Sequence, residues 1–184
     1  LGGDGIFAEF AEAMREATAV AHSLGMRMKL LAAANTVGPG WYSACPNLAD
    51  DRALILRLWR HWLEQLEGTD IVGIFPGDPG GCNRNGCTHE TFVELALELT
   101  DVITGANPGA RIELGTWGTP FSGWGSDLWP MTGWDGTWKR IFETHDPGPE
   151  TIHIWNGTPE RAALAMEYLV ERLSAFPEDM LVAI

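Results

Sequence analysis

One aspartate stands out among the residues whose chemistry could support catalysis. Asp78 follows the apolar run Ile71–Phe75 and is surrounded by glycines at positions 77, 80 and 81. Glycine lets a ligand approach the backbone closely, although an aspartate in such a turn can also serve only as an acceptor of backbone hydrogen bonds. Because a carboxylate directly after a buried strand favours a role in a pocket, we predict that Asp78 is a catalytic or substrate-orienting group.

Cleavage of a glycosidic bond needs a second carboxyl group beside the first. Glu113 lies within the predicted strand 111–117, on the same face as Trp117, and we predict it as the partner of Asp78. If the strand belongs to a barrel, the alternative is a side chain that sits in the barrel interior or is solvated near its lower rim. Asp127 and Asp135 lie in a Gly/Trp-rich loop, where either a loop-forming or a functional role fits the sequence.

Aromatic and amide side chains offer a way to hold a sugar. Trp117 and Trp155 end predicted strands, and Trp124 lies in the loop between them. A flat aromatic ring suits the C–H faces of a sugar, whereas packing of the loop against the fold is the plainer alternative. Asn35 and Asn156 also end predicted strands, so we predict that they donate hydrogen bonds to hydroxyl groups.

The three cysteines allow several interpretations. Cys82 and Cys87 flank a four-residue segment, His89 follows two positions later, and Cys45 could add a third sulfur. Thiolates and an imidazole are ligands for zinc, but this spacing is not a strong zinc signature. A Cys82–Cys87 disulfide, or thiols packed under the loop, fits equally well, so we predict no cofactor and keep the metal site as an alternative.

Strands and helices alternate along the chain. Helical periodicity predicts helices over 6–24, 50–66, 88–104, 137–144 and 159–176, and apolar runs predict strands over 26–34, 71–75, 111–117, 151–155 and 180–184. Asp50 or Asp51 is the expected cap of the second helix, Thr88 that of the third, and Pro159 suits a first helical position. Strict alternation predicts a parallel sheet with right-handed crossovers.

The loops favour a TIM-type (β/α) barrel over a doubly wound nucleotide-binding sheet. Asp78 and Pro79 interrupt the run of backbone donors that a phosphate-binding turn needs. The long loops, over 35–47, 76–87 and 118–136, all follow strand carboxyl ends, as in barrel enzymes. A full barrel has eight strands, so we predict one partial barrel domain over residues 1–184 with about five βα units. Its open edges would be completed by a remaining barrel segment or in a homo-oligomer.

Composition limits the partners. The formal net charge of −13 argues against nucleic acid and anionic membranes, which require a basic face, and fits a neutral carbohydrate substrate. No apolar run approaches the roughly 20 residues that cross a bilayer. The first residues lack the pattern of a signal peptide, which favours a cytoplasmic over a secreted protein, and the missing initiator Met favours a trimmed chain or fragment.

The turn after the second predicted strand carries a family resemblance. Phe75–Cys82, followed by Cys87, resembles a pattern in uncharacterised bacterial glycoside-hydrolase-like barrels related to the β-hexosaminidase (family 20-like) superfamily. In that group a helix and a strand ending in Thr-Trp follow, and Thr116–Trp117 matches that strand end. Asp4–Phe7 and Ala44–Pro46 are also similar to the group. The resemblance covers about residues 4–117 and implies a (β/α) barrel that hydrolyses sugars.

Two positions depart from that pattern. Arg84 stands where a middle cysteine of the cluster would be, which weakens a four-sulfur metal site. Asp78 is followed by Pro79 rather than by Glu, so the resemblance implies no acetamido-assisted mechanism, and it carries over Asp78 alone. We therefore expect a glycoside hydrolase-like enzyme. A metal-dependent barrel hydrolase and a non-catalytic carbohydrate-binding protein are the alternatives.

Overall fold

A computed structural model describes residues 4–35, 37, 44–75, 85, 87–115 and 159–183. Helices and strands alternate through most of these residues, as the apolar periodicity predicts. In chain order the elements are α1 (Asp4–Ser23), β1 (Lys29–Ala33), α2 (Ala49–Gln65), β2 (Ile71–Phe75), α3 (His89–Ala106), β3 (Arg111–Gly115), α6 (Pro159–Arg172), the short 3₁₀ helix η1 (Leu173–Ala175) and β4 (Leu181–Ala183). No helix in these ranges is both long and apolar enough to cross a membrane.

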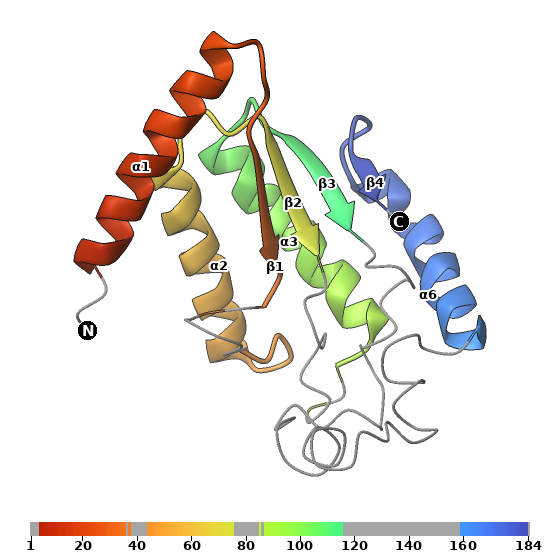
Figure 1. Ribbon diagram of the computed structural model, residues 1–184. Coiled ribbons are helices and arrows are strands. Elements are labelled where there is room, and N and C mark those ends of the chain that lie inside the picture. Colours follow the sequence, from red (N-terminus) through yellow and green to blue (C-terminus); the bar gives the residue numbers. More distant parts are fainter. Residues whose placement is uncertain are drawn as a thin grey trace, which may run out of the picture.

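The four strands form one parallel sheet in the order β1-β2-β3-β4, with their carboxyl ends at the same edge (Figure 1). The register places Leu31 beside Gly73, and Gly73 beside Glu113. An α/β fold with a parallel sheet is therefore confirmed. Four strands in this arrangement fit a segment of a barrel and equally an open sheet.

The sheet differs from the prediction at β4. A ladder of five consecutive βα units would place the predicted strand 151–155 between β3 and the final strand. Instead, Glu113 of β3 pairs directly with Leu181 of β4, and Leu114 pairs with Val182. The segment 151–155 and the predicted helix 137–144 lie outside the described residues. The direct pairing means that no strand separates β3 from β4.

Helices α2 and α3 pack side by side against one face of the sheet (Figure 1). Alternate strand residues point into this layer, as the two-residue period of a strand requires. The strand side chains in this core are Leu30, Ala32, Val72, Ile74, Ile112 and Leu114. They meet fully buried helix side chains, among them Ile55, Trp59, Phe92, Leu95 and Leu99. The continuous apolar sequence of β2 follows from its central place, because residues 72–74 are all buried.

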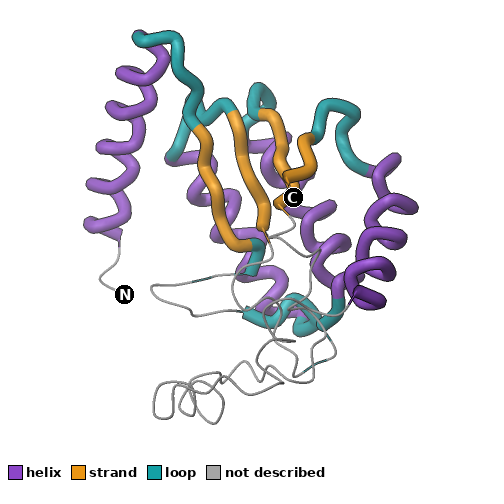
Figure 2. The backbone as a smooth tube through the Cα atoms, turned by 45° about the vertical axis from the view of Figure 1, so that its right-hand side comes forward, coloured by secondary structure: helices purple, strands orange, loops and turns teal. Residues whose placement is uncertain are grey.

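Helix α1 lies at the β1 end and α6 at the β4 end in both views (Figure 1 and Figure 2). The end of α1 is attached to the turn before β2, where His22 Nε2 lies 2.8 Å from Asp70 Oδ2. The same carboxylate accepts the Met28 N–H at 2.6 Å. The hydrogen bond from Met28, and then the one from His22, hold the pKa of Asp70 below its ordinary value.

Gly25 lies in the turn that follows the end of α1 at Ser23. Its φ is +73°, its N–H donates to the His22 carbonyl, and the Met26 N–H reaches back to the Ala21 carbonyl. These two bonds form a Schellman motif, which needs the left-handed conformation that glycine adopts without strain.

We expect Gly25→Ala to lower the free energy of unfolding by about 1–2 kcal/mol, because a Cβ in the left-handed region is strained. Gly105→Ala is the matched control, since Gly105 lies within α3 with open space around a new Cβ. There the change should raise stability by roughly 0.5 kcal/mol. Urea titrations followed by circular dichroism measure both, and equal effects at the two positions would contradict the assignment.

Candidate functional site

Most of the predicted site residues follow the carboxyl ends of strands in the sequence. In the sequence, Asp78 follows the last residue of β2 by three positions, and Trp117 follows the last residue of β3 by two. The predicted residues Asp78, Cys82, Trp117, Trp124, Trp155 and Asn156 lie outside the described residues. The described part of the carboxyl edge of the sheet consists of residues 34–35, 37, 44–48, 85 and 87–88.

Asn35 joins the two ends of the segment that leaves β1. Its side-chain Nδ2 donates to the Ala44 carbonyl at 3.2 Å, and its own carbonyl accepts the Ala44 N–H at 2.9 Å. The side chain is only 1% exposed. Asn35 thus has a structural role that the sequence did not indicate, while its predicted contact with a sugar hydroxyl stays a prediction.

Two cysteines from different segments meet beside this edge. Cys45 Sγ lies 3.7 Å from Cys87 Sγ, and both side chains are buried. Asn85 Nδ2 lies 3.3 Å from Cys45 Sγ, so the amide donates to the sulfur. Asn47 Nδ2 in turn donates to the Asn85 carbonyl at 2.8 Å. The segments around Cys45 and Cys87 are therefore connected by polar contacts as well as by the two sulfurs.

The start of α2 fixes Cys45 and corrects the predicted helix cap. The N-cap residue is Leu48, not Asp50 or Asp51. The Asp51 carboxylate instead accepts the Cys45 N–H at 2.8 Å. This aspartate, in the first helical turn, is used to hold the preceding loop, and its charge also suits the positive end of the helix.

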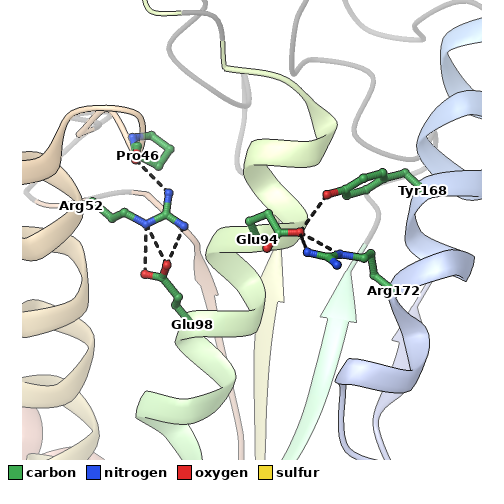
Figure 3. A network of polar contacts seen from close by, with 6 residues as sticks. All are labelled: Pro46, Arg52, Glu94, Glu98, Tyr168 and Arg172. Carbon is green, nitrogen blue, oxygen red and sulfur yellow. Dashed lines mark hydrogen bonds and ion pairs between the residues drawn. The ribbon is translucent and has the colours of Figure 1, made fainter.

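Arg52 connects the same loop to α3 (Figure 3). Its NH1 group donates to the Pro46 carbonyl at 3.1 Å, while Nε and NH2 form a forked pair with Glu98 at 2.8–3.1 Å. A guanidinium can make all these bonds at once because its donors are arranged in a rigid plane. Arg52 therefore fixes the position of the Cys45 loop relative to α3.

Glu113 lies on the face of the sheet that is turned away from α2 and α3. Its carboxylate pairs with Lys29 Nζ of β1. The pair spans β2 at Gly73, where a Cβ would come within 2.6 Å of Leu31 Cδ1 and 3.3 Å of Lys29 Cε. The Glu113 side chain is 13% exposed and lies two residues, about 6.6 Å, before the strand end. The structure gives Glu113 a charge partner, and its catalytic role stays a prediction.

His89 begins α3 directly after the predicted cap Thr88, which the structure confirms as the N-cap. Its ring meets Tyr168 of α6 edge to face, with centroids 5.8 Å apart. Burial lowers the pKa of His89. Among the described residues, no group of three or more His, Cys, Asp or Glu side chains could hold a metal ion. Cys82, the third member of the predicted metal set, lies outside them.

A cluster of polar side chains joins α6 to α3 (Figure 3). Glu94 Oε1 accepts bonds from Tyr168 Oη at 2.8 Å and from Arg172 Nε at 2.8 Å. Partial burial acts to raise the pKa of Glu94, but the bonds from Arg172 and Tyr168 outweigh it, and the pKa lies below its ordinary value. Burial, followed by the carboxylate of Glu94, raises the pKa of Tyr168.

The lowered pKa of Glu94 predicts part of the acid sensitivity of the fold. A carboxyl group whose pKa is depressed on folding stabilises the protein above its unfolded pKa, near 4.5, and loses that effect as the pH falls through the lower folded value. We expect Glu94→Gln to reduce stability at pH 7 and to flatten the decline below about pH 5. Tyr168→Phe should retain most of that decline because Arg172 still pairs with Glu94. Thermal melts from pH 3 to pH 7 measure this, and an unchanged acid slope in Glu94→Gln would contradict it.

Comparison with known proteins identified no relative of this chain. No protein-family model matches the chain, and no significant match was found among curated proteins or solved structures. The functional argument therefore depends on the residues and on their arrangement alone.

Sequence reasoning missed three features, two of them at this edge and one within the sheet. These are the Asn35–Ala44 closure, the Asp51 contact to Cys45, and the pairing of Lys29 with Glu113. Cys45 was considered as a third sulfur, and the structure does bring it next to Cys87. The only available signal for the ion pair was one basic residue in β1, Lys29, and one acidic residue in β3, Glu113.

Proposed function

We propose that the chain is a glycoside hydrolase-like enzyme that cleaves a glycosidic bond with carboxylate acid/base chemistry at the carboxyl edge of its parallel sheet. The observation that supports this most is the arrangement of β1, β2 and β3. Their carboxyl ends lie at one edge, and a long segment follows each of them in the sequence. Parallel α/β sheets bind ligands at this edge, and barrel enzymes carry their catalytic residues there.

The residue types that follow those strands fit a sugar better than a charged ligand. The segment after β2 contains Asp78, and the segment after β3 contains Trp117 and Trp124. Carboxylates for proton transfer and aromatic rings for stacking are the combination that carbohydrate hydrolysis uses. The net charge of −13 disfavours phosphorylated or otherwise anionic substrates, which supports a neutral sugar.

The first test is direct hydrolysis by the purified chain. Chromogenic aryl glycosides of common hexoses, pentoses and N-acetylhexosamines, in both anomeric forms, are incubated with the protein, and oligosaccharides are followed by the release of reducing ends. Hydrolysis that survives a strong metal chelator supports the proposal. Hydrolysis that is lost with the chelator and restored by metal supports the metal-dependent hydrolase instead.

Binding is measured in parallel, because a carbohydrate-binding protein would share the tryptophans. Calorimetric titration with the same oligosaccharides reports affinity whether or not a bond is cleaved. Binding without hydrolysis of any substrate contradicts the enzyme and supports the non-catalytic alternative. If the chain neither binds nor hydrolyses any of these sugars, both the enzyme and the carbohydrate-binding alternative are contradicted.

A further inference from the structure

We propose that Cys45 and Cys87 are a redox-sensitive pair that closes a reversible disulfide between the segments that precede α2 and α3. In the structure both residues are thiols, and their sulfur atoms lie 3.7 Å apart, at the distance of an S–H···S hydrogen bond. A disulfide bond is about 2.05 Å long, so the sulfurs must approach each other by about 1.7 Å. Rotation about the Cα–Cβ bonds moves a cysteine sulfur by more than this distance.

The two sulfurs are brought together by the fold, because 42 positions separate them in the chain. The Cys45 N–H donates to the Asp51 carboxylate in the first turn of α2, and Cys87 directly precedes Thr88, the N-cap of α3. Helices α2 and α3 pack against each other in one core. Groups that are held in this way react as if they were highly concentrated, which favours a bond between them.

Two asparagines hold the same segments to each other. Asn85 Nδ2 donates to Cys45 Sγ at 3.3 Å, and Asn47 Nδ2 donates to the Asn85 carbonyl at 2.8 Å. Asn85 lies two positions before Cys87, so both bonds connect the Cys87 segment to the loop that carries Cys45. They restrict the motion of the two sulfurs in the dithiol, which reduces the entropy that is lost when the disulfide closes.

Burial indicates which oxidant can reach the pair. Cys45 is 5% exposed and Cys87 is 1% exposed, so a bulky disulfide has little access to either sulfur. A hydroperoxide is small enough to react at such a position, and we therefore assign hydrogen peroxide as the oxidant. The resulting cross-link would join the connections that follow β1 and β2, beside the carboxyl edge of the sheet. The inference does not depend on the proposed sugar chemistry.

The step is a two-electron oxidation. The thiolate of Cys45, the more exposed of the two residues, attacks one peroxide oxygen, the O–O bond breaks, and a sulfenic acid forms as water leaves. The thiolate of Cys87 then attacks the Cys45 sulfur, so that the S–S bond forms, the S–O bond breaks and a second water leaves. In total the two thiols lose two hydrogens, and hydrogen peroxide becomes two water molecules. A dithiol reductant reverses the change by thiol–disulfide exchange.

The test is peroxide treatment of the reduced 184-residue chain, followed by peptide mapping. Remaining thiols are blocked with N-ethylmaleimide, the chain is digested, and linked peptides are identified by mass spectrometry. We expect one linked pair of peptides that contains Cys45 and Cys87, and we expect dithiothreitol to separate it. This measurement uses the unmodified chain, so it does not depend on the folding of any variant.

The variant Cys82→Ser isolates the pair, because it leaves only Cys45 and Cys87 as thiols. After oxidation its unfolding equilibrium constant should be about 10²–10³-fold below that of the reduced form, since the cross-link spans 42 positions. Adding Cys87→Ser removes the second sulfur. Peroxide should then leave a sulfenic acid at Cys45, which dimedone traps, and should give no gain in stability.

An asparagine variant tests whether the fold positions the pair. In a mixture of reduced and oxidised dithiothreitol, Asn47→Ala should shift the equilibrium toward the dithiol by about 2–10-fold, through the loss of one hydrogen bond. Asn107→Ala is the matched control, because Asn107 donates to the Thr69 carbonyl and to neither sulfur. Its equilibrium should equal that of the unmodified chain.

Three results would overturn the proposal. The first is a linked peptide that contains Cys82 in place of Cys45 or Cys87, which is the pairing that sequence spacing allows. The second is a folded chain in which peroxide leaves both thiols unchanged or produces sulfinic acid at Cys45 without a cross-link. The third is a mapped Cys45–Cys87 bond that gives Cys82→Ser no stability, because a bond that strains the fold contradicts a pair held ready for closure.

Discussion

Trp59→Ala should lower the free energy of unfolding by about 3–5 kcal/mol, the cost of deleting a large buried aromatic side chain. Trp59 is 1% exposed and lies where α2 meets the sheet and α3. A domain of this size is stable by about 5–15 kcal/mol, so the variant should lose a large share of its stability. Urea unfolding followed by far-ultraviolet circular dichroism measures the loss, which avoids dependence on tryptophan fluorescence.

Two further variants separate the contributions of Trp59. Trp62 lies on the same helix with its ring centroid 6.5 Å away, but it is only partly buried. Trp62→Ala should therefore cost clearly less. Trp59→Phe retains most of the apolar area but removes the Nε1–H that donates to the Ala34 carbonyl at 3.1 Å. Leaving that buried carbonyl without its donor should cost about 1–3 kcal/mol.

The Trp59–Ala34 bond also connects the core to the candidate site. Ala34 follows β1, directly before Asn35 and the segment that leads to Cys45. Trp59 is buried and Trp62 only partly buried. Equal losses of stability in Trp59→Ala and Trp62→Ala would therefore contradict the expected effect of burial.

Sequence periodicity predicted the helices of the described residues well, because each buries one side of its surface. The helix now called α3 was expected over 88–104 and spans His89–Ala106, with the predicted Thr88 as its N-cap. The strand β2 was placed at the observed residues because all five of them are apolar or glycine, and the three at 72–74 are buried. These features depend on local sequence and on the general requirement to bury apolar surface.

The features that sequence reasoning missed depend on which distant segments become neighbours. Lys29 and Glu113 are 84 positions apart and meet only because the parallel register aligns their strands on either side of Gly73. Asp51 looked like a helix cap because local patterns favour that role, yet a tertiary contact to Cys45 uses its carboxylate. The direct pairing of β3 with β4 was missed for the same reason, since chain order alone placed another strand between them.

The ion pair of Glu113 with Lys29 gives a way to test the predicted second carboxylate. A purely structural pair predicts that Glu113→Gln and Lys29→Met lower stability by similar amounts and leave kcat unchanged. A catalytic Glu113 predicts that kcat falls in Glu113→Gln only. This comparison requires the substrate identified by the hydrolysis screen, and it decides the role of Glu113 independently of Asp78.

For the proposed glycosidase, Asp78→Asn should lower kcat by about 10²–10⁴-fold, the usual contribution of one positioned acid or base. Asparagine has nearly the same shape as aspartate but cannot exchange a proton at neutral pH, so sugar affinity should be retained. The pH–rate profile should also lose the limb that reports this carboxyl group. Asp101→Asn is the matched control, because Asp101 is an exposed residue near the end of α3, which leads back to the amino end of β3. It makes the same chemical change away from the carboxyl edge and should leave kcat unchanged.

A full rate in Asp78→Asn would remove Asp78 from the mechanism. The acid and base would then have to come from other carboxylates, with Glu113 the first to examine through its comparison with Lys29.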